Sequence, residues 1–596
     1  MKLINKKYIF TLSAFFLTLY FHAAFGQQII PQQRLTDYTN AGLKDSLPAA
    51  DSFINVLDLG AIPNDGTADD DAFQSALDLA VGQVAEVWIP AGEYNLTQPL
   101  NLSSGTYLTG VSADSVLLKF ELPQANNLIA ANGSLTNDTT PIQPANTFDT
   151  VLICTDTSHS IVPGDVLLLH QDAEDYVTSD WALQAMGQIV EVADTMDNKI
   201  FIHEEIRHDY PAGNNPCLIR MEPLENLSVS NLSIERTDSH DQQASNIKFQ
   251  YVRNAKVHAI ISANCIFSHI SVRYASHVLI EGSYFHHAHD YGGGGRGYGV
   301  EISFATGECL VVNNVFEHLR HSMLLQACSN GNVFAYNYSK DAYWDEDYLP
   351  AESAGDLVLH GNYPYRNLFE GNIAQNLVVD NSHGINGPNN AFFRNRLEKY
   401  GIFMNTGPAT DSVIYVGNEI TDNGFLTGLY QLEGSGHIEH ANLQYDTWHP
   451  DGTDYLETQS LFREYAPCYF TEAGIPWPFA GPPYALDENI NPAQQRYEAG
   501  NMVFEGCDQP VSVFLKNKQN ISMYPNPAVN KVYINGNREN PFRIYLYNAM
   551  GYMLKSFDVQ PPLPSSIDIT DIKSGVYFIV APDISFQEKL IILKQR

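Results

Sequence analysis

Basic residues are scarce in this sequence of 596 residues, which holds 33 Lys and Arg against 68 Asp and Glu. Nucleic acids and anionic membrane surfaces bind proteins through clustered positive charge, so the deficit excludes a general affinity for either. Long apolar runs are scarce too. After Gln27 no apolar stretch is long enough to span a bilayer, and we expect no membrane span.

Cysteine is also rare, with seven in the chain. So few cannot build the disulfide framework of a small secreted domain. No CxxC or HExxH pattern occurs, so nothing supports a tight zinc site. Cys265, Cys309 and Cys328 stand in apolar, strand-like contexts and are predicted to be buried thiols, whereas pairing of Cys468 with Cys507 stays open.

The N-terminal end has three lysines among its first seven residues, then the apolar run YIFTLSAFFLTLYF, then small residues at Ala24 and Gly26. This order is typical of a secretory signal peptide, with cleavage before Gln27. The run is short and no stop-transfer pattern follows, which disfavours a membrane anchor. We therefore expect an exported protein, and a monomer.

The C-terminal residues 520–596 differ in character from the rest. ISMYPNPAVNKVYINGN, FRIYLYNAMGYMLKSF and IDITDIKSGVYFIV are short alternating strands between Gly, Asn and Pro turns. Through YPNP, LYNAMG and SGVYF this tail resembles the C-terminal sorting domain of the type IX secretion system. The resemblance implies type IX secretion machinery as a partner and a location at the cell surface or outside the cell. The alternative is a small β-sandwich that binds a ligand.

Asparagine recurs at a fixed interval in the body of the chain. VVNNVF, FAYNYS, FEGNIA, FRNRLE and YVGNEI align on Asn314, Asn337, Asn372, Asn395 and Asn418, in steps of 23, 35, 23 and 23 residues. A repeat of this length, with short β-branched and aromatic strands and no long helical periodicity, is typical of a parallel β-helix. The asparagines are predicted to form a stacked ladder that bonds turn backbone.

The same register is expected to include Asn254 and His277, which are also 23 residues apart. His360 and His383 share this spacing too, so they are predicted to stack in one sheet, in a column with Leu325 and Ile302.

The N-terminal body contains VLDLGAIPNDGTADDDAFQSALDLA followed by EVWIPAGEYNLTQPLNLSSGTYLTGV. These segments resemble the opening of pectate lyase superfamily proteins, which are right-handed parallel β-helices acting mostly on polysaccharides. The resemblance implies that the Asp-rich piece caps the β-helix and that the IPAGEY strand begins the first coil. Asp69, Asp70 and Asp71 are predicted to cap a helix N-terminus rather than to act in catalysis.

The predicted fold class is all-β: a right-handed parallel β-helix solenoid of about 23-residue coils, a small inserted β-domain and a C-terminal β-sandwich sorting domain. The segments IVPGDVLLLHQD and KIFIHEEI interrupt the period, and after Asn423 it fades into a segment rich in Pro and aromatics. The predicted boundaries are a signal peptide over 1–26, a lead segment over 27–52, the capped start of the β-helix over 53–139, the inserted β-domain over 140–222, the coils over 223–425, an irregular C-terminal cap over 426–510, a linker over 511–519 and the sorting domain over 520–596.

Three connections between predicted strands are rich in polar residues: HHAHDYGGGGRGY, EHLRH and KDAYWDEDYLPAESAG. They precede equivalent strands of successive coils, so they are expected at one edge, where the longest should build a cleft. Besides the aromatic residues discussed next, they gather His286, His287, His289, Asp290, Arg296, Glu317, His318, Arg320, His321, Asp341, Asp345, Glu346, Asp347 and Glu352.

A cleft of this kind suits a sugar chain, since Tyr343, Trp344 and Tyr348 offer flat apolar faces beside carboxylates that bind hydroxyls. In β-elimination a cation, Arg or bound calcium, neutralises a uronate while a base removes the neighbouring proton. In hydrolysis two carboxyls flank the bond. The predicted catalytic residues are Arg320, His321, His360, His383, Asp345 and Asp347; the predicted substrate-binding residues are Arg296, His287, His289, Glu301, Trp344 and Tyr343; Asp345, Glu346 and Asp347 form a candidate calcium site.

The predicted function is a secreted carbohydrate-active enzyme that cleaves a polysaccharide as a lyase or glycosidase. The related pectin hydrolases usually carry paired aspartates and a GHG stretch, whereas this chain has only SHG at 382–384, which slightly favours the lyase. A non-catalytic glycan-binding or adhesive surface protein is the alternative from another class. A polyuronate epimerase is the third, and it would create no unsaturated sugar.

Overall fold

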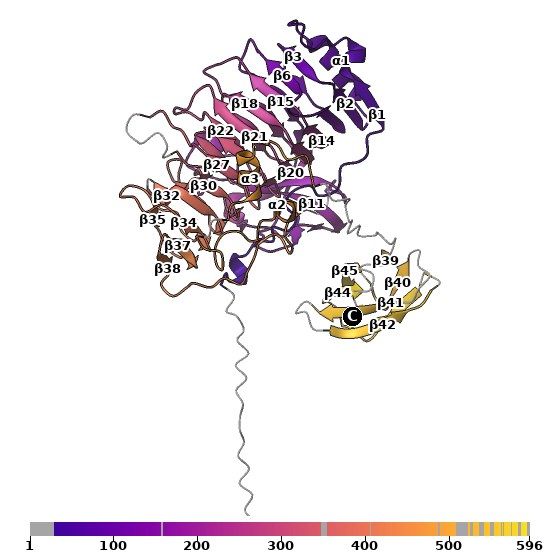
Figure 1. The fold of residues 1–596 in the computed structure, drawn as a ribbon. Coiled ribbons are helices and arrows are strands. Elements are labelled where there is room, and N and C mark those ends of the chain that lie inside the picture. The colour runs from indigo at the N-terminus through magenta and orange to yellow at the C-terminus, as the bar shows by residue number, and fades with distance from the viewer. Residues whose placement is uncertain are drawn as a thin grey trace, which may run out of the picture. The chain divides into compact units, whose positions relative to one another are not determined.

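The computed structural model describes residues 29–156, 159–346, 354–405, 407–486 and 489–507, and parts of 522–592. Two compact units, 1–506 and 507–596, make up the chain, and each is described by itself (Figure 1). The predicted signal peptide and linker, Asp347, Tyr348 and Glu352 lie outside the described residues.

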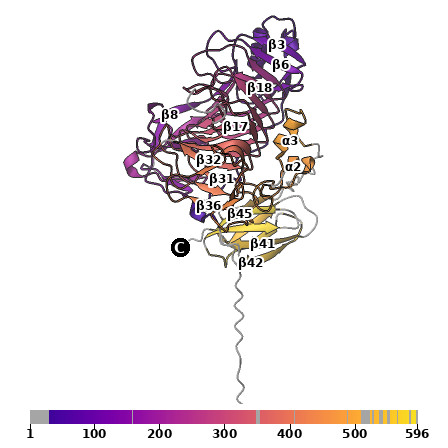
Figure 2. The ribbon, with the colours of Figure 1, turned by 60° about the vertical axis from the view of Figure 1, so that its left-hand side comes forward.

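Sheet 1 of the larger unit stacks one parallel strand from each coil on the next (Figure 2). Its described strands, in spatial order, are β1 (Ser52–Asn55), β2 (Ala85–Ile89), β5 (Thr106–Gly110), β14 (Leu224–Ser230), β17 (Val252–His258), β20 (Ser276–Glu281), β23 (Leu310–Val312), β26 (Val333–Ala335), β29 (Leu368–Glu370), β31 (Ala391–Phe393), β33 (Ile414–Val416) and β36 (Ile438–His440).

Two further parallel sheets complete each coil, and β30 (Ile373–Asp380) and β32 (Arg396–Asn405) run through both. Sheet 2 also contains β3 (Gly92–Leu96), β6 (Val116–Phe120), β15 (Ser233–Arg236), β18 (Ile261–Cys265), β21 (Tyr284–Ala288), β24 (Val315–Glu317), β27 (Tyr338–Lys340), β34 (Glu419–Ile420), β37 (Asn442–Gln444) and its antiparallel neighbour β38 (Thr447–His449). Sheet 3 also contains β4 (Leu100–Asn101), β7 (Ile129–Asn132), β16 (Ile247–Gln250), β19 (Ser268–Arg273), β22 (Tyr298–Ser303), β25 (His321–Leu325), β28 (Leu357–Leu359) and β35 (Leu429–Gln431). The chain is therefore the predicted right-handed parallel β-helix.

Alternation along each strand builds the core. In β2 the residues Ala85, Val87 and Ile89 are buried while their neighbours are half-buried. Along the axis, equivalent aromatic residues stack inside the helix, with ring centroids 5.1 Å apart between Phe369 and Phe392. Successive coils thus repeat the same inward contact about every 4.8 Å.

The asparagine ladder is confirmed, at the corner between sheets 1 and 2. Asn395 Nδ2 donates to Asn418 Oδ1 at 3.1 Å and to the Phe369 carbonyl at 2.9 Å, while Asn395 Oδ1 accepts from the backbone N–H of Asn372. A second ladder that the sequence did not reveal joins Asn367 to Asn390 at the corner between sheets 3 and 1. Both ladders satisfy buried turn groups that strands cannot reach.

The placement of Asn254 and His277 in the Asn314 register is wrong. They lie instead at the corner between sheets 3 and 1, each with positive φ, 54° and 57°. Glu308 and Arg366 continue this left-handed column, with φ of 51° and 52°. The left-handed backbone turns these side chains outward, toward the segments that cover the corner.

The predicted column for His360 is also wrong by one residue. Leu359, not His360, pairs with Leu325 and then with Val379, at spacings of 34 and 20 residues. The period of 23 counts from one asparagine turn to the next, and the connections within each coil differ in length, so strand register departs from it.

The N-terminal helix α1 (Asp70–Ala80) covers the first coil. Asp69 occupies its N-cap position but makes no side-chain bond to a helix amide. Its carboxylate accepts instead from the N–H groups of Ile62 and Asn95, and Asp70 accepts from Thr97. The expected role as a helix cap is therefore replaced by fastening the helix to the first coil.

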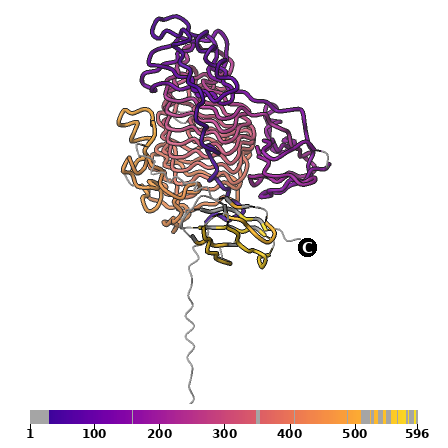
Figure 3. The backbone as a smooth tube through the Cα atoms, turned by 90° about the vertical axis from the view of Figure 1, so that its right-hand side faces the viewer, coloured from indigo at the N-terminus to yellow at the C-terminus, as the bar shows by residue number. Residues whose placement is uncertain are grey.

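The inserted sheet is a six-stranded antiparallel sheet placed between β7 and β14. Its order is β8 (Ser134–Pro141), β13 (Cys217–Glu222), β10 (Val166–His170), β11 (Gly187–Met196), β12 (Lys199–Ile202) and β9 (Val151–Ile153). It stands beside the coils at the corner between sheets 3 and 1, where Ala327, Cys328 and Tyr365 pack against it (Figure 3).

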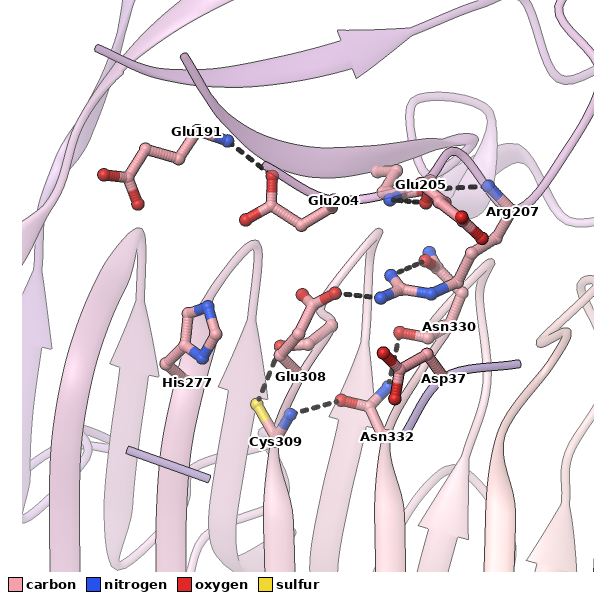
Figure 4. A network of polar contacts seen from close by, with 12 residues as sticks. Asp37, Glu191, Glu204, Glu205, Arg207, His277, Glu308, Cys309, Asn330 and Asn332 are labelled. Atoms are coloured by element: carbon pink, nitrogen blue, oxygen red, sulfur yellow. Dashed lines mark hydrogen bonds and ion pairs between the residues drawn. The ribbon is translucent and has the colours of Figure 1, made fainter. Parts of the chain in front are cut away.

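A buried polar network fastens the inserted sheet to the left-handed column (Figure 4). Arg207 forms an ion pair with Glu308 and donates to Asn330 Oδ1 at 3.0 Å. Glu204 Oε2 accepts from the Glu191 N–H at 2.9 Å. Burial, and then repulsion from Glu308, raises the pKa of Glu204 to about 7.

Residues 29–51 form a strap that runs along the coils (Figure 3). Arg34 Nε donates to Asn389 Oδ1 at 2.7 Å, the Gly42 N–H donates to the Glu308 carbonyl at 2.8 Å, and the Asp51 N–H donates to the Val84 carbonyl at 2.8 Å. The strap therefore bonds to late, middle and early coils in turn.

The coils continue past residue 425 to β36 and β37, because Asn442 follows Asn418 by 24 residues and still joins the ladder at 2.9 Å. The segment beyond carries α2 (Cys468–Ala473) and α3 (Pro492–Glu498), whose Asn491 N-cap donates to the Asn337 carbonyl. The five cysteines Cys154, Cys217, Cys265, Cys309 and Cys328 are free thiols, and Cys468 and Cys507 are disulfide-bonded.

The C-terminal unit is a sandwich of two antiparallel sheets. One contains β39 (Ser522–Tyr524), β40 (Lys531–Asn535) and β43 (Ser565–Asp568); the other contains β42 (Met553–Val559), β41 (Phe542–Asn548), β44 (Gly575–Ala581) and β45 (Phe586–Ile592). Ile534, Leu546 and Ile579 belong to its own core.

Candidate functional site

The outer face of sheet 3 carries charged side chains on adjacent coils. On β19, Ile270 and Val272 point into the core, so alternation points Ser271 and Arg273 outward. Lys248 of β16 pairs with Ser271 in the strand register and is half-buried. Burial lowers the pKa of Lys248, and the nearby Arg273 lowers it further, although Glu301 opposes both.

Glu301 of β22 lies in the same outward column and is fully buried. Its carboxylate accepts from Ser271 Oγ at 2.6 Å and from Gln326 Nε2 at 2.9 Å. Arg273 Nε lies 3.6 Å from Glu301 Oε2. The sequence predicted Glu301 as a substrate-binding residue, and the structure places it where it fixes Arg273.

Arg273 is sandwiched between two aromatic rings. Its guanidinium carbon lies 5.5 Å from the Phe267 centroid and 5.3 Å from the Phe304 centroid. About a quarter of the side chain is exposed, so one side of this cation can meet a ligand.

Three histidines form a stacked column at the later coils of sheet 3. His321 and His360 have ring centroids 5.3 Å apart, and His360 and His383 are 5.0 Å apart. His360 Nε2 lies 3.4 Å from Asp380 Oδ2. Burial holds the pKa of His321 far below its usual value and lowers that of His360 to about 4, so both are neutral near pH 7. Of the three, only His383 is half-exposed.

Arg320 lies beneath the glycine-rich loop, 290–297. Its guanidinium donates to the Gly292 carbonyl and lies 4.8 Å from the Trp344 ring and 5.8 Å from the Tyr298 ring. The residue is only 8% exposed. These contacts suit a loop support better than the predicted catalytic cation.

The glycine-rich loop packs against the Trp344 loop. A side chain at Gly292 would come within 3.3 Å of an Asp345 carboxylate oxygen, and Asp345 itself is exposed. Arg296, predicted to bind substrate, pairs with Asp290 at 3.1 Å instead. Among the described residues no group of three His, Cys, Asp or Glu is placed to hold a metal ion. Asp347 is not among them, so calcium binding by Asp345, Glu346 and Asp347 stays a prediction.

The structure divides the predicted site between two sheet faces. His287, His318 and Tyr343 stack over sheet 2, with centroids 4.9 Å and 4.6 Å apart, and His318 Nδ1 lies 2.7 Å from Asp341 Oδ2. His289 points elsewhere, toward the Arg236 carbonyl. The polar connections do meet at one edge, as predicted, but that edge is the corner between sheets 2 and 3, from which side chains leave on both faces.

The inserted sheet's segment supplies the opposite side of the sheet 3 face. Trp181, 47% exposed, lies 5.8 Å from Phe304 and 6.4 Å from His383 between ring centroids. Sequence reasoning missed Lys248, Arg273 and Trp181. Outward alternation on β16 and β19 signals the two cations, but no sequence pattern connects Trp181 with coils more than 100 residues away.

Two cavities of about 600 and 570 Å³ lie away from this face. The first is lined by Asp422, Tyr430 and Tyr445 among others, and the second by Ile29, Phe393 and Tyr455 among others. The sheet 3 face is therefore defined by its exposed cation, histidine and tryptophan, and not by an enclosed volume.

Residues 53–155 match the family described as rhamnogalacturonase A/epimerase, pectate lyase-like. Residues 522–593 match the secretion system C-terminal sorting domain. The protein therefore carries a sorting domain for export to the cell surface or beyond. A search of curated proteins finds no match. In the described part of the chain no helix has the length and apolarity to cross a membrane.

Solved structures with a similar course of the chain include the tailspike gp61 of Pseudomonas phage phi297, with 15% identity, a TM-score of 0.48, and coverage of 66% of this chain and 74% of that one. The Acinetobacter baumannii bacteriophage AP22 tailspike Gp54, solved with capsular saccharide, shows 12% identity, a TM-score of 0.43, and coverage of 66% and 72%. A hyperthermoactive exopolygalacturonase from Thermotoga maritima shows 12% identity, a TM-score of 0.34, and coverage of 65% and 84%.

Proposed function

We propose that this exported protein cleaves an acidic polysaccharide by β-elimination on the outer face of sheet 3. The observation that carries the proposal is the pair of cations Lys248 and Arg273 on adjacent coils. Arg273, held by Glu301 and two aromatic rings, would neutralise the uronate carboxylate. Lys248, whose pKa is lowered, would remove the neighbouring proton, as burial-tuned lysine bases do.

Hydrolysis fits the same face less well. The two carboxylates that border it, Glu301 on β22 and Asp380 on β30, lie three coils apart, or roughly 14 Å at the strand spacing. Inverting and retaining hydrolases need about 5 to 9.5 Å between their carboxyls. The predicted role of His383 changes accordingly, from base to a contact for sugar residues farther along the chain, beside Trp181.

A glycan-binding protein without turnover is the second candidate. It is favoured by the burial of Arg320, His321 and His360, three of the residues that the sequence singled out for catalysis. On this hypothesis the exposed Arg273, His383 and Trp181 would bind an acidic glycan without a base in position.

The test incubates the secreted protein with neutral and acidic polysaccharides and follows unsaturated uronate absorbance and reducing ends together. Lys248→Met should lower the elimination rate by about 10²- to 10⁴-fold, the usual contribution of a general base. Lys256→Met is the matched control, since Lys256 lies on sheet 1 and pairs with Glu281 at 4.0 Å.

Each outcome has a distinct meaning. Reducing ends without absorbance indicate a hydrolase and refute elimination, and a changed uronate composition without cleavage indicates an epimerase. Binding with no reaction on any glycan supports the second candidate. Full elimination activity in Lys248→Met would remove Lys248 from the mechanism.

A further inference from the structure

The connection between β34 and β35 displays apolar side chains on a fixed loop. Asp422 Oδ1 accepts from the Gly424 N–H at 2.7 Å and from Thr427 Oγ1 at 3.0 Å, which closes residues 422–428 on themselves. The Gly428 N–H donates to the Lys399 carbonyl of the preceding coil at 2.7 Å. At the loop's tip Phe425 is 97% exposed and Leu426 70% exposed.

A cavity of about 600 Å³ lies between this loop, β35 and the turn that joins β37 to β38. Its volume falls within the range of small-ligand sites. Gln444 Nε2 donates to the Gly428 carbonyl at 2.6 Å, and the Tyr430 ring stacks on His449 with centroids 4.2 Å apart. The walls are therefore held by contacts within the protein.

The lining of the cavity is polar and carries no lysine or arginine among the described residues. Asn423 and Gln431 are exposed, and within the described part of the chain neither side chain is hydrogen-bonded. Tyr445, 46% exposed, adds an aromatic face, and Asp446 adds a carboxylate. Amide donors and acceptors, carboxylate acceptors and aromatic faces together match the hydroxyls and apolar ring faces of uncharged sugars.

The cavity lies on the same edge as the glycine-rich and Trp344 loops, because all three segments connect sheet 2 to sheet 3. Three coils separate the Trp344 loop from the cavity, or roughly 14 Å. A polymer that follows the coils can therefore reach both places.

We propose that this cavity is a second saccharide site, separate from the sheet 3 face, that binds neutral sugar residues. Phe425 and Tyr445 supply apolar faces at its rim, and Asn423, Gln431 and Asp446 receive the hydroxyls. The proposal rests on the proposed function for its ligand class, a polysaccharide. It adds that the substrate carries neutral residues as well as uronates, since the cavity offers a uronate no cation.

The test measures binding of neutral gluco-, galacto-, manno- and xylo-oligosaccharides and of oligogalacturonides to the full secreted chain by calorimetry. At least one neutral oligosaccharide should bind, and Phe425→Ala and Tyr445→Ala should each raise its Kd by about tenfold through the lost ring contact. Tyr465→Ala is the control, because Tyr465 is an aromatic residue 73% exposed outside the cavity lining.

The two proposals fail separately. Lys248→Met should abolish cleavage and leave neutral-sugar binding unchanged, whereas Phe425→Ala should do the reverse on short acidic substrates. No neutral binding, binding of oligogalacturonides alone, or an unchanged Kd in both ring variants would overturn the second site and leave the first untouched.

Discussion

Removing one partner of the Arg207–Glu308 ion pair should loosen the inserted sheet from the coils. The two side chains are 8% and 3% exposed, so water cannot solvate the charge that is left behind. Glu308→Leu should therefore lower the free energy of unfolding by about 3 to 5 kcal/mol. The effect should spread from Arg207, because its guanidinium also holds Asn330 on the coil.

Replacing both partners gives a sharper test than either single change. Arg207→Met combined with Glu308→Leu removes both buried charges, so most of the loss should be recovered. The surface pair Lys119–Glu93, 3.5 Å long and 39% and 42% exposed, provides the control, and Lys119→Ala should cost about 1 kcal/mol or less.

Urea unfolding gives the free energies, and hydrogen exchange over residues 134–222 shows whether the inserted sheet opens first. The reasoning is refuted if Glu308→Leu costs no more than Lys119→Ala. It is equally refuted if the two single changes simply add in the double variant, because additivity means that the groups do not interact.

The pKa of Glu204, raised from 4.5 to about 7, means that the stability from its neutral form is present below pH 4.5 and lost as pH rises through 7; Glu204→Gln should remove about 3 kcal/mol of this pH dependence, as measured by unfolding from pH 4 to 8. If Lys248 is the base, the elimination rate should keep rising above pH 7 as Lys248 deprotonates, whereas a plateau just above pH 6.5 would indicate a histidine instead. Gly361→Ala should weaken glycan binding, because a methyl group there would lie 2.9 Å from His383 atoms and φ is +74°; an unchanged Kd with normal folding would contradict this. Asn395→Leu should cost at least about 3 kcal/mol, since its partners lose their bonds in a buried ladder, and a smaller loss in urea unfolding would show that the turn relaxes.

Much of the architecture was readable in the sequence. The asparagine interval predicted the coils, because a ladder needs the same residue at each turn and strand stacking repeats the turn along the axis. The sorting domain was readable from local strand and turn motifs, which need no distant partner. The buried thiols followed from apolar strand contexts in the same way.

Register and burial were decided by the tertiary structure. The period is counted at the turns, but connections of unequal length shift the strands between them, so His360 was assigned one residue away from its place. Polar connections gathered at one edge, but whether a side chain leaves on sheet 2, on sheet 3 or beneath a loop depends on strand alternation and covering segments.

By itself, the sequence determined the periodic backbone, the export signal and the corner where polar loops meet, because each follows from contacts between equivalent or neighbouring residues. Only the tertiary structure decided that Lys248 and Arg273 share a face with Glu301, and that Trp181 of the inserted segment reaches His383. Those contacts join segments of unrelated sequence spacing, so no period records them.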